Sequence, residues 1–334
     1  MPWLSLPTGL LPVVLLLGGM LVLDSYKLVT TKLVLRSVGF GGAAAVAAWG
    51  LNRLAIDLAA VPPDTLRRWI APVLEEGLKL SWIALLIRRR RVAFLVDAGI
   101  HGFAVGTGFA VVENLYYAAT LGRTGFLLWV VRGLGTAVMH GVATGVGAIL
   151  ARELTERRGS NSWKWFGPGV AAAAMVHSVF NQLPFPPLVS TACVVLGAPI
   201  ILIVTYETSE RRTRRWLGAT LDRDIELLDD IRRGTITETP VGFYLASVRQ
   251  HFPGPVVADM LCLLEIQAQL ALRAKGILIA REAGLELPVD DAVRANLEEL
   301  KYLRKNIGKT GMMAILPFLG TSDRDLWQLQ LLKK

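Results

Sequence analysis

Seven apolar stretches constrain this chain more than any other feature of its sequence. A transmembrane helix takes about 17–25 predominantly apolar residues. The stretches cover residues 7–23, 33–51, 71–87, 93–118, 126–151, 164–183 and 187–206. The first lacks the basic start of a signal peptide and is interpreted as a helix. The sequence therefore predicts an all-α fold, with a polytopic bundle of about seven transmembrane helices.

Composition and charge divide the chain into two domains. The chain is 53% hydrophobic and 19% charged, whereas soluble domains carry about 25% charged residues. Residues 1–206 hold 17 Lys/Arg and 9 Asp/Glu, and residues 207–334 hold 19 and 18. The basic excess lies in the apolar half, which argues against nucleic-acid binding, because that function needs a basic face on a soluble module. We expect a transmembrane domain over 1–206 and a cytoplasmic α-helical domain over 207–334.

Loop charges predict the orientation, because Lys and Arg in short loops favour the cytoplasm. The basic stretches "RRRR" (88–91), "RELTERR" (152–158) and "RRTRR" (211–215) follow alternate apolar segments. They place the N-terminus outside and the C-terminus in the cytoplasm, although Arg53 and the pair at 67–68 would then lie in an outer loop. We expect a multi-pass protein of the bacterial cytoplasmic (inner) membrane.

Ionisable residues interrupt the third apolar segment, "PVLEEGLKLSW" (72–82). Charged groups at membrane depth cost about 2.5–3.5 kcal/mol each. Glu75, Glu76 and Lys79 lie in its first turns. Two interpretations need no function: a wet interfacial position, or an i,i+4 ion pair between Glu75 and Lys79.

Three further apolar segments also carry costly polar groups. Glu113 lies in the fourth, His140 in the fifth with Arg132 two turns earlier, and His177 and Asn181 in the sixth. Residues four apart share a helix face, so His177 and Asn181 are predicted to point at one place. A single buried histidine is often a packing residue, but four consecutive segments of this kind predict one shared polar site in the outer half of the membrane.

Glycines predict which helices meet. Gly102/Gly106 and Gly141/Gly145 are small-xxx-small pairs in the fourth and fifth segments. Such faces let membrane helices approach closely. Most of these glycines serve ordinary packing, but the pairs place the helices of Glu113 and His140 side by side.

Two routes to water activation fit these residue types. A buried glutamate can act as general base, while His177 and Asn181 donate to a developing oxyanion. Alternatively, Glu113, His140 and His177 hold a divalent metal such as zinc, which accepts two His and one carboxylate. The first route needs no cofactor, and the HExxH zinc motif is absent from the sequence.

Four motifs resemble the PrsW family of intramembrane proteases, which is related to the type II CAAX prenyl endopeptidases and the Abi proteins. They are "EEGLK" (75–79), "GFAVVEN" (108–114), "RGLGTAVMHG" (132–141) and "HSVFN" (177–181). They occur in order across a motif core of about 65–185.

The resemblance implies roles for individual residues. It identifies Glu75 and Glu76 as the paired catalytic glutamates, with Lys79 as the basic residue of the same motif. His177 and Asn181 match HxxxN, and Glu113 replaces the histidine that the CAAX relatives carry in FxxxH. The implied function is endopeptidase cleavage of membrane-anchored protein substrates near the outer face, as in site-1 cleavage of an anti-sigma factor, by a metal-dependent or a glutamic mechanism.

Two questions stay open at this level. A transporter using the buried Glu, His and Lys as an ion or proton path is the alternative function, although inverted repeats are not apparent. Residues 207–334 read as charged amphipathic helices, which form either a self-contained bundle or a domain that binds a cytoplasmic partner.

Overall fold

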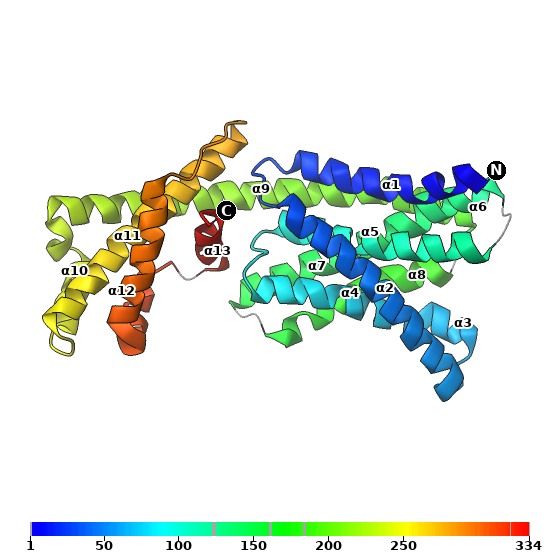
Figure 1. Ribbon diagram of the computed structural model, residues 1–334, viewed down its shortest axis with the longest axis horizontal. Coiled ribbons are helices and arrows are strands. Elements are labelled where there is room, and N and C mark those ends of the chain that lie inside the picture. Colours follow the sequence, from blue (N-terminus) through cyan, green and yellow to red (C-terminus); the bar gives the residue numbers. More distant parts are fainter. Residues whose placement is uncertain (1, 122–124, 160–161, 183–184, 321, 334) are drawn as a thin grey trace. The chain divides into compact units, whose positions relative to one another are not determined.

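The computed structural model describes residues 2–121, 125–159, 162–182, 185–320 and 322–333. Every regular element in these ranges is helical, which confirms the all-α prediction. The chain divides into two compact units, Met1–Glu210 and Arg211–Lys334 (Figure 1). The boundary falls inside one helix, α9 (Pro187–Arg233), so the apolar segment expected to end at 206 continues as helix into the charged region.

The first unit contains the predicted apolar helices. They are α1 (Pro2–Leu23), α2 (Thr31–Ala59), α4 (Ala71–Arg88), α5 (Leu95–Thr120), α7 (Val138–Arg158), α8 (Gly167–Gln182) and the start of α9. The shorter elements are α3 (Pro63–Thr65), α6 (Phe126–Val130), two π-helical turns at Leu66–Ile70 and Val131–Ala137, and a 3₁₀ turn at Trp163–Trp165. The π turns run directly into α4 and α7, so each of these helices has a widened N-terminal lead.

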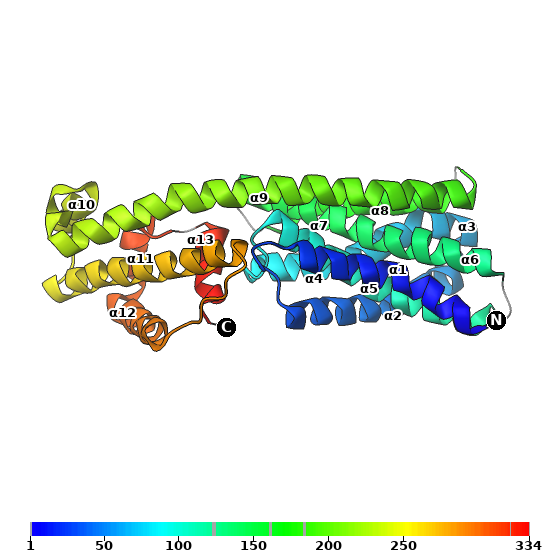
Figure 2. The ribbon, with the colours of Figure 1, turned by 90° about the horizontal axis from the view of Figure 1, so that it is seen from above.

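Helix α5 lies at the centre of the first unit. It packs against α7 and α2, while α8 packs against both α7 and α4 (Figure 2). A continuous core of Leu80, Ile83, Ile87, Val105 and Ala148 joins α4, α5 and α7. This packing brings together the four helices that carry the predicted polar residues.

Glycine makes the central helix contact possible. A Cβ at Gly102 would lie 2.8 Å from the carbonyl oxygen of Thr144, and a Cβ at Gly106 would overlap the backbone at His140 and Gly141. Only glycine allows the α5 backbone to approach α7 this closely, as small-residue faces do in membrane helix pairs. The prediction that the helices of Glu113 and His140 lie side by side is confirmed.

Five helices in the described part of the chain are long and apolar enough to cross a membrane. They are Thr31–Ala59, Leu95–Thr120, Phe126–Arg158, Pro187–Arg233 and Gly254–Glu282, with Pro7–Leu23 as a shorter apolar helix. Helix α4 is not among them because it carries three ionisable residues and ends on Arg88, and α8 is short. The Gly254–Glu282 helix qualifies by length and composition although the sequence placed it in the cytoplasmic domain.

The second unit is a helical assembly around that helix, α11 (Gly254–Glu282), which contacts α10 (Pro240–Val248), α12 (Asp291–Ile315) and α13 (Asp323–Leu331). Short 3₁₀ turns lie at Thr235–Glu238 and Leu316–Phe318. Lys275 is buried in α11, and its Nζ donates to Asp224 Oδ2 of α9 at 2.6 Å. Gly234, with φ at 77°, follows the last residue of α9, as expected for a helix stop.

Candidate active site

The Glu76 carboxylate is fully buried and saturated with hydrogen bonds. Lys79 Nζ donates to Glu76 Oε1 at 2.7 Å, and His177 Nδ1 lies 3.0 Å from the same oxygen. Thr144 Oγ1 donates to Oε2 at 2.8 Å. Glu76 and Lys79 have no exposed side-chain surface. Lys79 therefore pairs with Glu76 one turn before it, and not with Glu75 as the i,i+4 interpretation supposed.

The neighbouring Glu75 faces another way, because successive residues are rotated by about 100° on a helix. Asn52 Nδ2 of α2 donates to Glu75 Oε1 at 3.2 Å. Glu75 Oε2 lies 3.9 Å from His177 Nε2, and the Glu75 side chain is 14% exposed. The two adjacent glutamates thus contact the two nitrogens of one imidazole.

A second chain of contacts runs from Lys79 through His140. Lys79 Nζ lies 3.0 Å from His140 Nδ1, and His140 Nε2 lies 3.0 Å from Glu113 Oε2. An ammonium only donates, so Nδ1 accepts and Nε2 carries the proton that is donated to Glu113; the tautomer is assigned from this network. Arg132 Nη2 lies 3.5 Å from the same Glu113 oxygen.

Arg132 is held by several groups at once. Its Nε donates to Asn114 Oδ1 at 2.8 Å, and its guanidinium lies 3.8 Å from the centre of the Tyr117 ring. Asn114 Nδ2 in turn donates to the carbonyl oxygen of Gly9 at 2.7 Å. These contacts connect α1, the π turn before α7, and α5, and they fix Arg132 beside Glu113.

Aromatic packing closes the inner side of the cluster. The rings of His140 and His177 meet edge to face, with centroids 4.7 Å apart. Lys79 Nζ lies 3.9 Å over the centre of the Phe109 ring, a cation–π contact. Phe109 is buried, as are both histidines. On this side of the cluster, the Lys79 ammonium and the two imidazoles are therefore packed against other side chains of the protein.

Six of the seven predicted site residues meet in one cluster: Glu75, Glu76, Lys79, Glu113, His140 and His177. Asn181 lies elsewhere, and its Nδ2 donates to the carbonyl oxygen of Arg67 at 3.0 Å. Four residues advance a helix by about 6 Å, so Asn181 lies a full turn from His177, at the level of the π turn before α4. This hydrogen bond connects α8 to the π turn that precedes α4, the helix that carries both glutamates.

Two contributors were missed from the sequence. Thr144 follows His140 by four residues, so helical spacing alone could have placed it on the same face. Asn52 lies in the last third of α2 and has no such spacing signal, because its contact with Glu75 depends on how α2 crosses α4.

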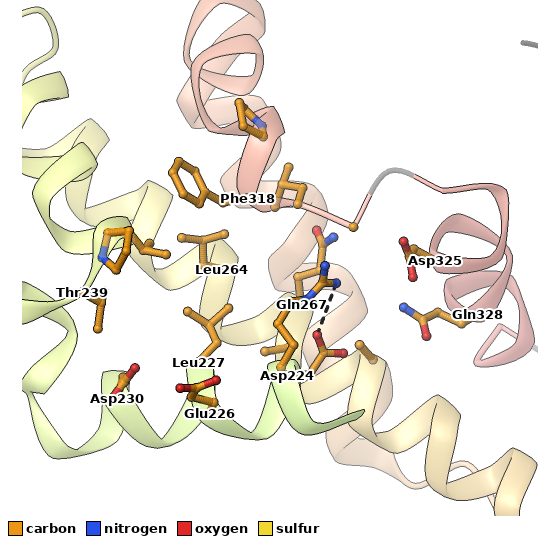
Figure 3. A pocket seen from close by; sticks show the side chains of 18 residues that line it. Asp224, Glu226, Leu227, Asp230, Thr239, Leu264, Gln267, Phe318, Asp325 and Gln328 are labelled. Carbon is orange, nitrogen blue, oxygen red and sulfur yellow. Dashed lines mark ion pairs between the residues drawn. The ribbon is translucent and has the colours of Figure 1, made fainter. Parts of the chain in front are cut away.

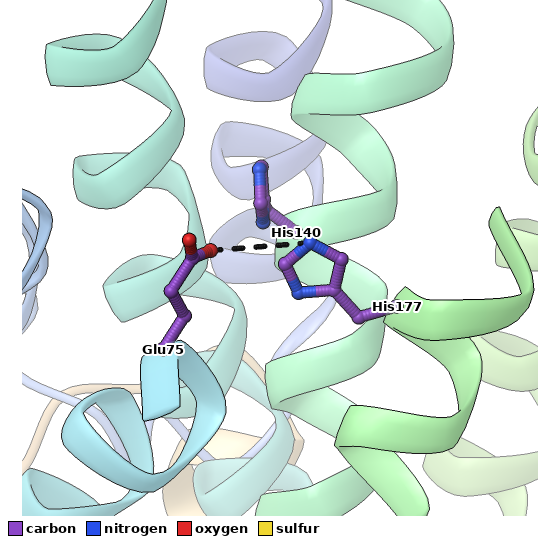
Figure 4. Close-up of side chains that lie close together, drawn as sticks. All are labelled: Glu75, His140 and His177. Atoms are coloured by element: carbon purple, nitrogen blue, oxygen red, sulfur yellow. Dashed lines mark ion pairs between the residues drawn. The ribbon is translucent and has the colours of Figure 1, made fainter. Parts of the chain in front are cut away.

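Glu75, His140 and His177 form a group that could hold a metal ion, with one ligand atom from each within 4.8 Å of the others (Figure 4). Glu113, which the sequence predicts as a member of the ligand set, is not a member of this group among the described residues, although its Oε2 lies 3.0 Å from His140 Nε2. One carboxylate and two imidazoles are a zinc-type donor set.

The surroundings fit a cation in two respects. Glu76 accepts from His177 Nδ1, which leaves Nε2 to face Glu75, and a carboxylate behind a ligating histidine is the usual outer-shell support. The cluster also carries three carboxylates against one lysine, with Arg132 beside Glu113. His140 fits with one condition: both of its nitrogens are engaged, so it becomes a ligand only when its contact with Lys79 or Glu113 opens.

The long apolar helices indicate a multi-pass membrane protein, and its first unit holds a mostly buried Glu–His cluster. The description "PrsW family intramembrane metalloprotease" matches residues 30–205, more than half of the chain. The chain therefore belongs to the PrsW family and is a hydrolase, which confirms the resemblance carried by the four motifs. No curated protein and no solved structure matches the chain.

Proposed function

We propose that this protein is an endopeptidase that cleaves membrane-anchored proteins at a site toward the outer face of the membrane. The observation that supports the proposal is the difference in environment between two adjacent glutamates. Glu76 is buried and its carboxylate oxygens are hydrogen-bonded, while Glu75 is partly exposed beside His177 Nε2. A centre for hydrolysis needs this combination of a fixed scaffold and an accessible reacting group.

Glu75 and His177, with His140 once one of its contacts opens, are the residues that would hold a divalent metal. When bound there, such an ion supplies Lewis-acid polarisation of water and of the peptide carbonyl. Glu76 is then a positioning residue, because it orients the His177 ring through Nδ1.

Proton transfer falls to Glu113 in this arrangement. Its side chain is 27% exposed and its Oε2 is supported by His140 and Arg132. Because it is the other carboxylate of the cluster with exposed surface, it can take a proton from water and return it to the leaving amine. Lys79 neutralises the buried Glu76 and keeps the scaffold intact.

The proposed topology uses seven crossings: α1, α2, α4, α5, α6 with α7, α8 and α9. Helices α4 and α8 cross despite their polarity or length because neighbouring helices cover their polar residues. The N-terminus lies outside and the second unit in the cytoplasm of a bacterial cell. Site-1-type cleavage of an anti-sigma factor is the substrate class that the family resemblance favours.

The test uses full-length protein in liposomes with membrane-anchored candidate substrates. We expect cleavage by the wild type, loss in Glu75→Gln and Glu76→Gln, and unchanged cleavage in Asp57→Asn, a control in the exposed Arg53–Asp57 pair of α2. Loss on chelation and recovery with zinc would support a metal. Intact cleavage in both glutamate variants would refute the assignment, and proton flux without cleavage would favour the transporter.

A further inference from the structure

A cavity of about 470 Å³ opens between α2, α4 and α5 and reaches the cluster. Glu75 and Glu113 both line it. They are also the carboxylates of the cluster with exposed surface, at 14% and 27%, whereas Glu76 has none. The cavity therefore gives a substrate bond a route to these carboxylates.

Most of the cavity wall is apolar. Val46 and Trp49 of α2 line it and are exposed, and Phe109 and Val112 of α5 line its other side. An apolar wall of this size accepts an aliphatic or aromatic side chain and disfavours a charged one.

One polar side chain in the cavity wall, Asn52, has only part of its hydrogen-bonding capacity satisfied. Asn52 lines the cavity, and its Nδ2 is bonded to Glu75. Its Oδ1 is buried and has no hydrogen-bond partner among the described residues. A buried acceptor without a partner costs about 1–3 kcal/mol, so it favours a ligand that brings an N–H donor.

We propose that this cavity, the α2–α5 groove, binds the substrate as an unwound, extended segment with an uncharged apolar side chain seated between α2 and α5. The interior of a helical segment offers Asn52 no free backbone N–H, because those groups are bonded within the helix. An extended segment offers a free N–H to Asn52 Oδ1 beside Glu75, which places a peptide carbonyl next to the reacting carboxylates. The inference rests on the proposed protease function and adds its substrate conformation and specificity pocket.

The first test narrows the groove with a matched control on the same helix. Val46→Trp puts a bulky ring into it, whereas Ala47→Trp adds the same ring at the next, exposed position outside the lining. The substrates are membrane-anchored peptides with Ala, Val, Leu, Phe or Asp beside the scissile bond. One methylene in an apolar pocket changes kcat/KM by about 10-fold or more. We expect Val46→Trp to lower kcat/KM for Leu and Phe by at least about that factor and to spare Ala, while Ala47→Trp leaves the order of preference unchanged.

The second test does not depend on catalysis. A substrate with a photo-crosslinking phenylalanine at that position is irradiated with the Glu76→Gln protein, and the crosslinked peptide is mapped by mass spectrometry. We expect crosslinks within residues 45–52 or 109–117, and their loss in Val46→Trp.

The outcomes separate the two proposals. If the wild type cleaves but Val46→Trp behaves like Ala47→Trp and crosslinks fall outside the groove, the groove proposal is wrong and the protease function stands. If copurified acyl chains, and not peptide, occupy the groove in native mass spectrometry, the groove is a lipid site. If the wild type cleaves nothing and no peptide crosslinks, both proposals fail.

Discussion

Each glutamate of the adjacent pair has its own environment because a helix turns by about 100° between neighbours. Glu76 turns into α7 and α8, where Thr144 and His177 meet it, and Glu75 turns toward α2 and the groove. The pairing of Lys79 with Glu76 follows from the same geometry. From these contacts we predict how substitutions change the stability of the protein and, separately, its activity.

The buried Glu76–Lys79 ion pair predicts that substitutions can change the stability of the protein and its activity separately. Removing one partner of a buried ion pair costs about 3–5 kcal/mol because the other charge stays behind. We expect Glu76→Gln to lower the melting temperature in detergent, and Glu76→Gln combined with Lys79→Met to restore much of it without restoring cleavage. Thermal unfolding and substrate cleavage measure the two effects. A double variant that regains activity would show that Glu76 does not orient His177.

The metal group predicts a pattern of metal content. Glu75→Gln and His177→Ala remove ligands, so we expect purified protein of either kind to lose zinc by elemental analysis. Glu113→Gln is the matched control, and we expect it to keep zinc while losing cleavage, because Glu113 lies outside the group. If Glu75→Gln keeps zinc and Glu113→Gln loses it, the ligands are the set expected from the sequence, with Glu113 in place of Glu75.

At the scale of elements, the close contact of α5 and α7 sets the position of His140. A Cβ at Gly106 would overlap the backbone at His140, while a Cβ at Gly39 of α2 meets nothing within 4 Å. Overpacking a tight contact costs about 1–3 kcal/mol.

We therefore expect Gly106→Ala to lower the melting temperature and to weaken cleavage by displacing His140 from Glu113. Gly39→Ala, the matched control, should leave both unchanged or slightly raise stability, because alanine favours helix. Equal effects of the two substitutions would mean that the α5–α7 distance does not control the site.

At the scale of the whole molecule, the proposed topology places α11 in the cytoplasm although this helix is long and apolar enough to cross a membrane. The chain has two cysteines, Cys193 and Cys262, both free and exposed, and Cys262 lies in α11. In Cys193→Ser protein, a membrane-impermeant maleimide should label Cys262 in inverted vesicles and not in spheroplasts.

The control for the outer side is Leu121→Cys, made in protein that lacks both native cysteines, at the end of α5. We expect it to be labelled in spheroplasts. Absence of Cys262 labelling in both preparations would indicate that α11 lies in the bilayer.

Most helices of the first unit and six residues of the cluster could be predicted from the amino-acid sequence, whereas Thr144 and Asn52 were missed. Apolar length predicted α2, α5, α7 and the start of α9, and polar residues in four consecutive apolar segments predicted one cluster. This succeeded because a polar group inside a membrane helix is costly unless another polar group meets it, so composition alone implies a partner.

The environment of each of these side chains depends on how the helices cross in the folded protein. Spacing fixes the angle of a side chain around its own helix, but not the depth at which another helix crosses. That crossing made Glu75 accessible and Glu76 buried, brought Asn52 to Glu75, and left Asn181 at the carbonyl of Arg67. It also placed Glu75, and not Glu113, within metal-binding reach of both histidines.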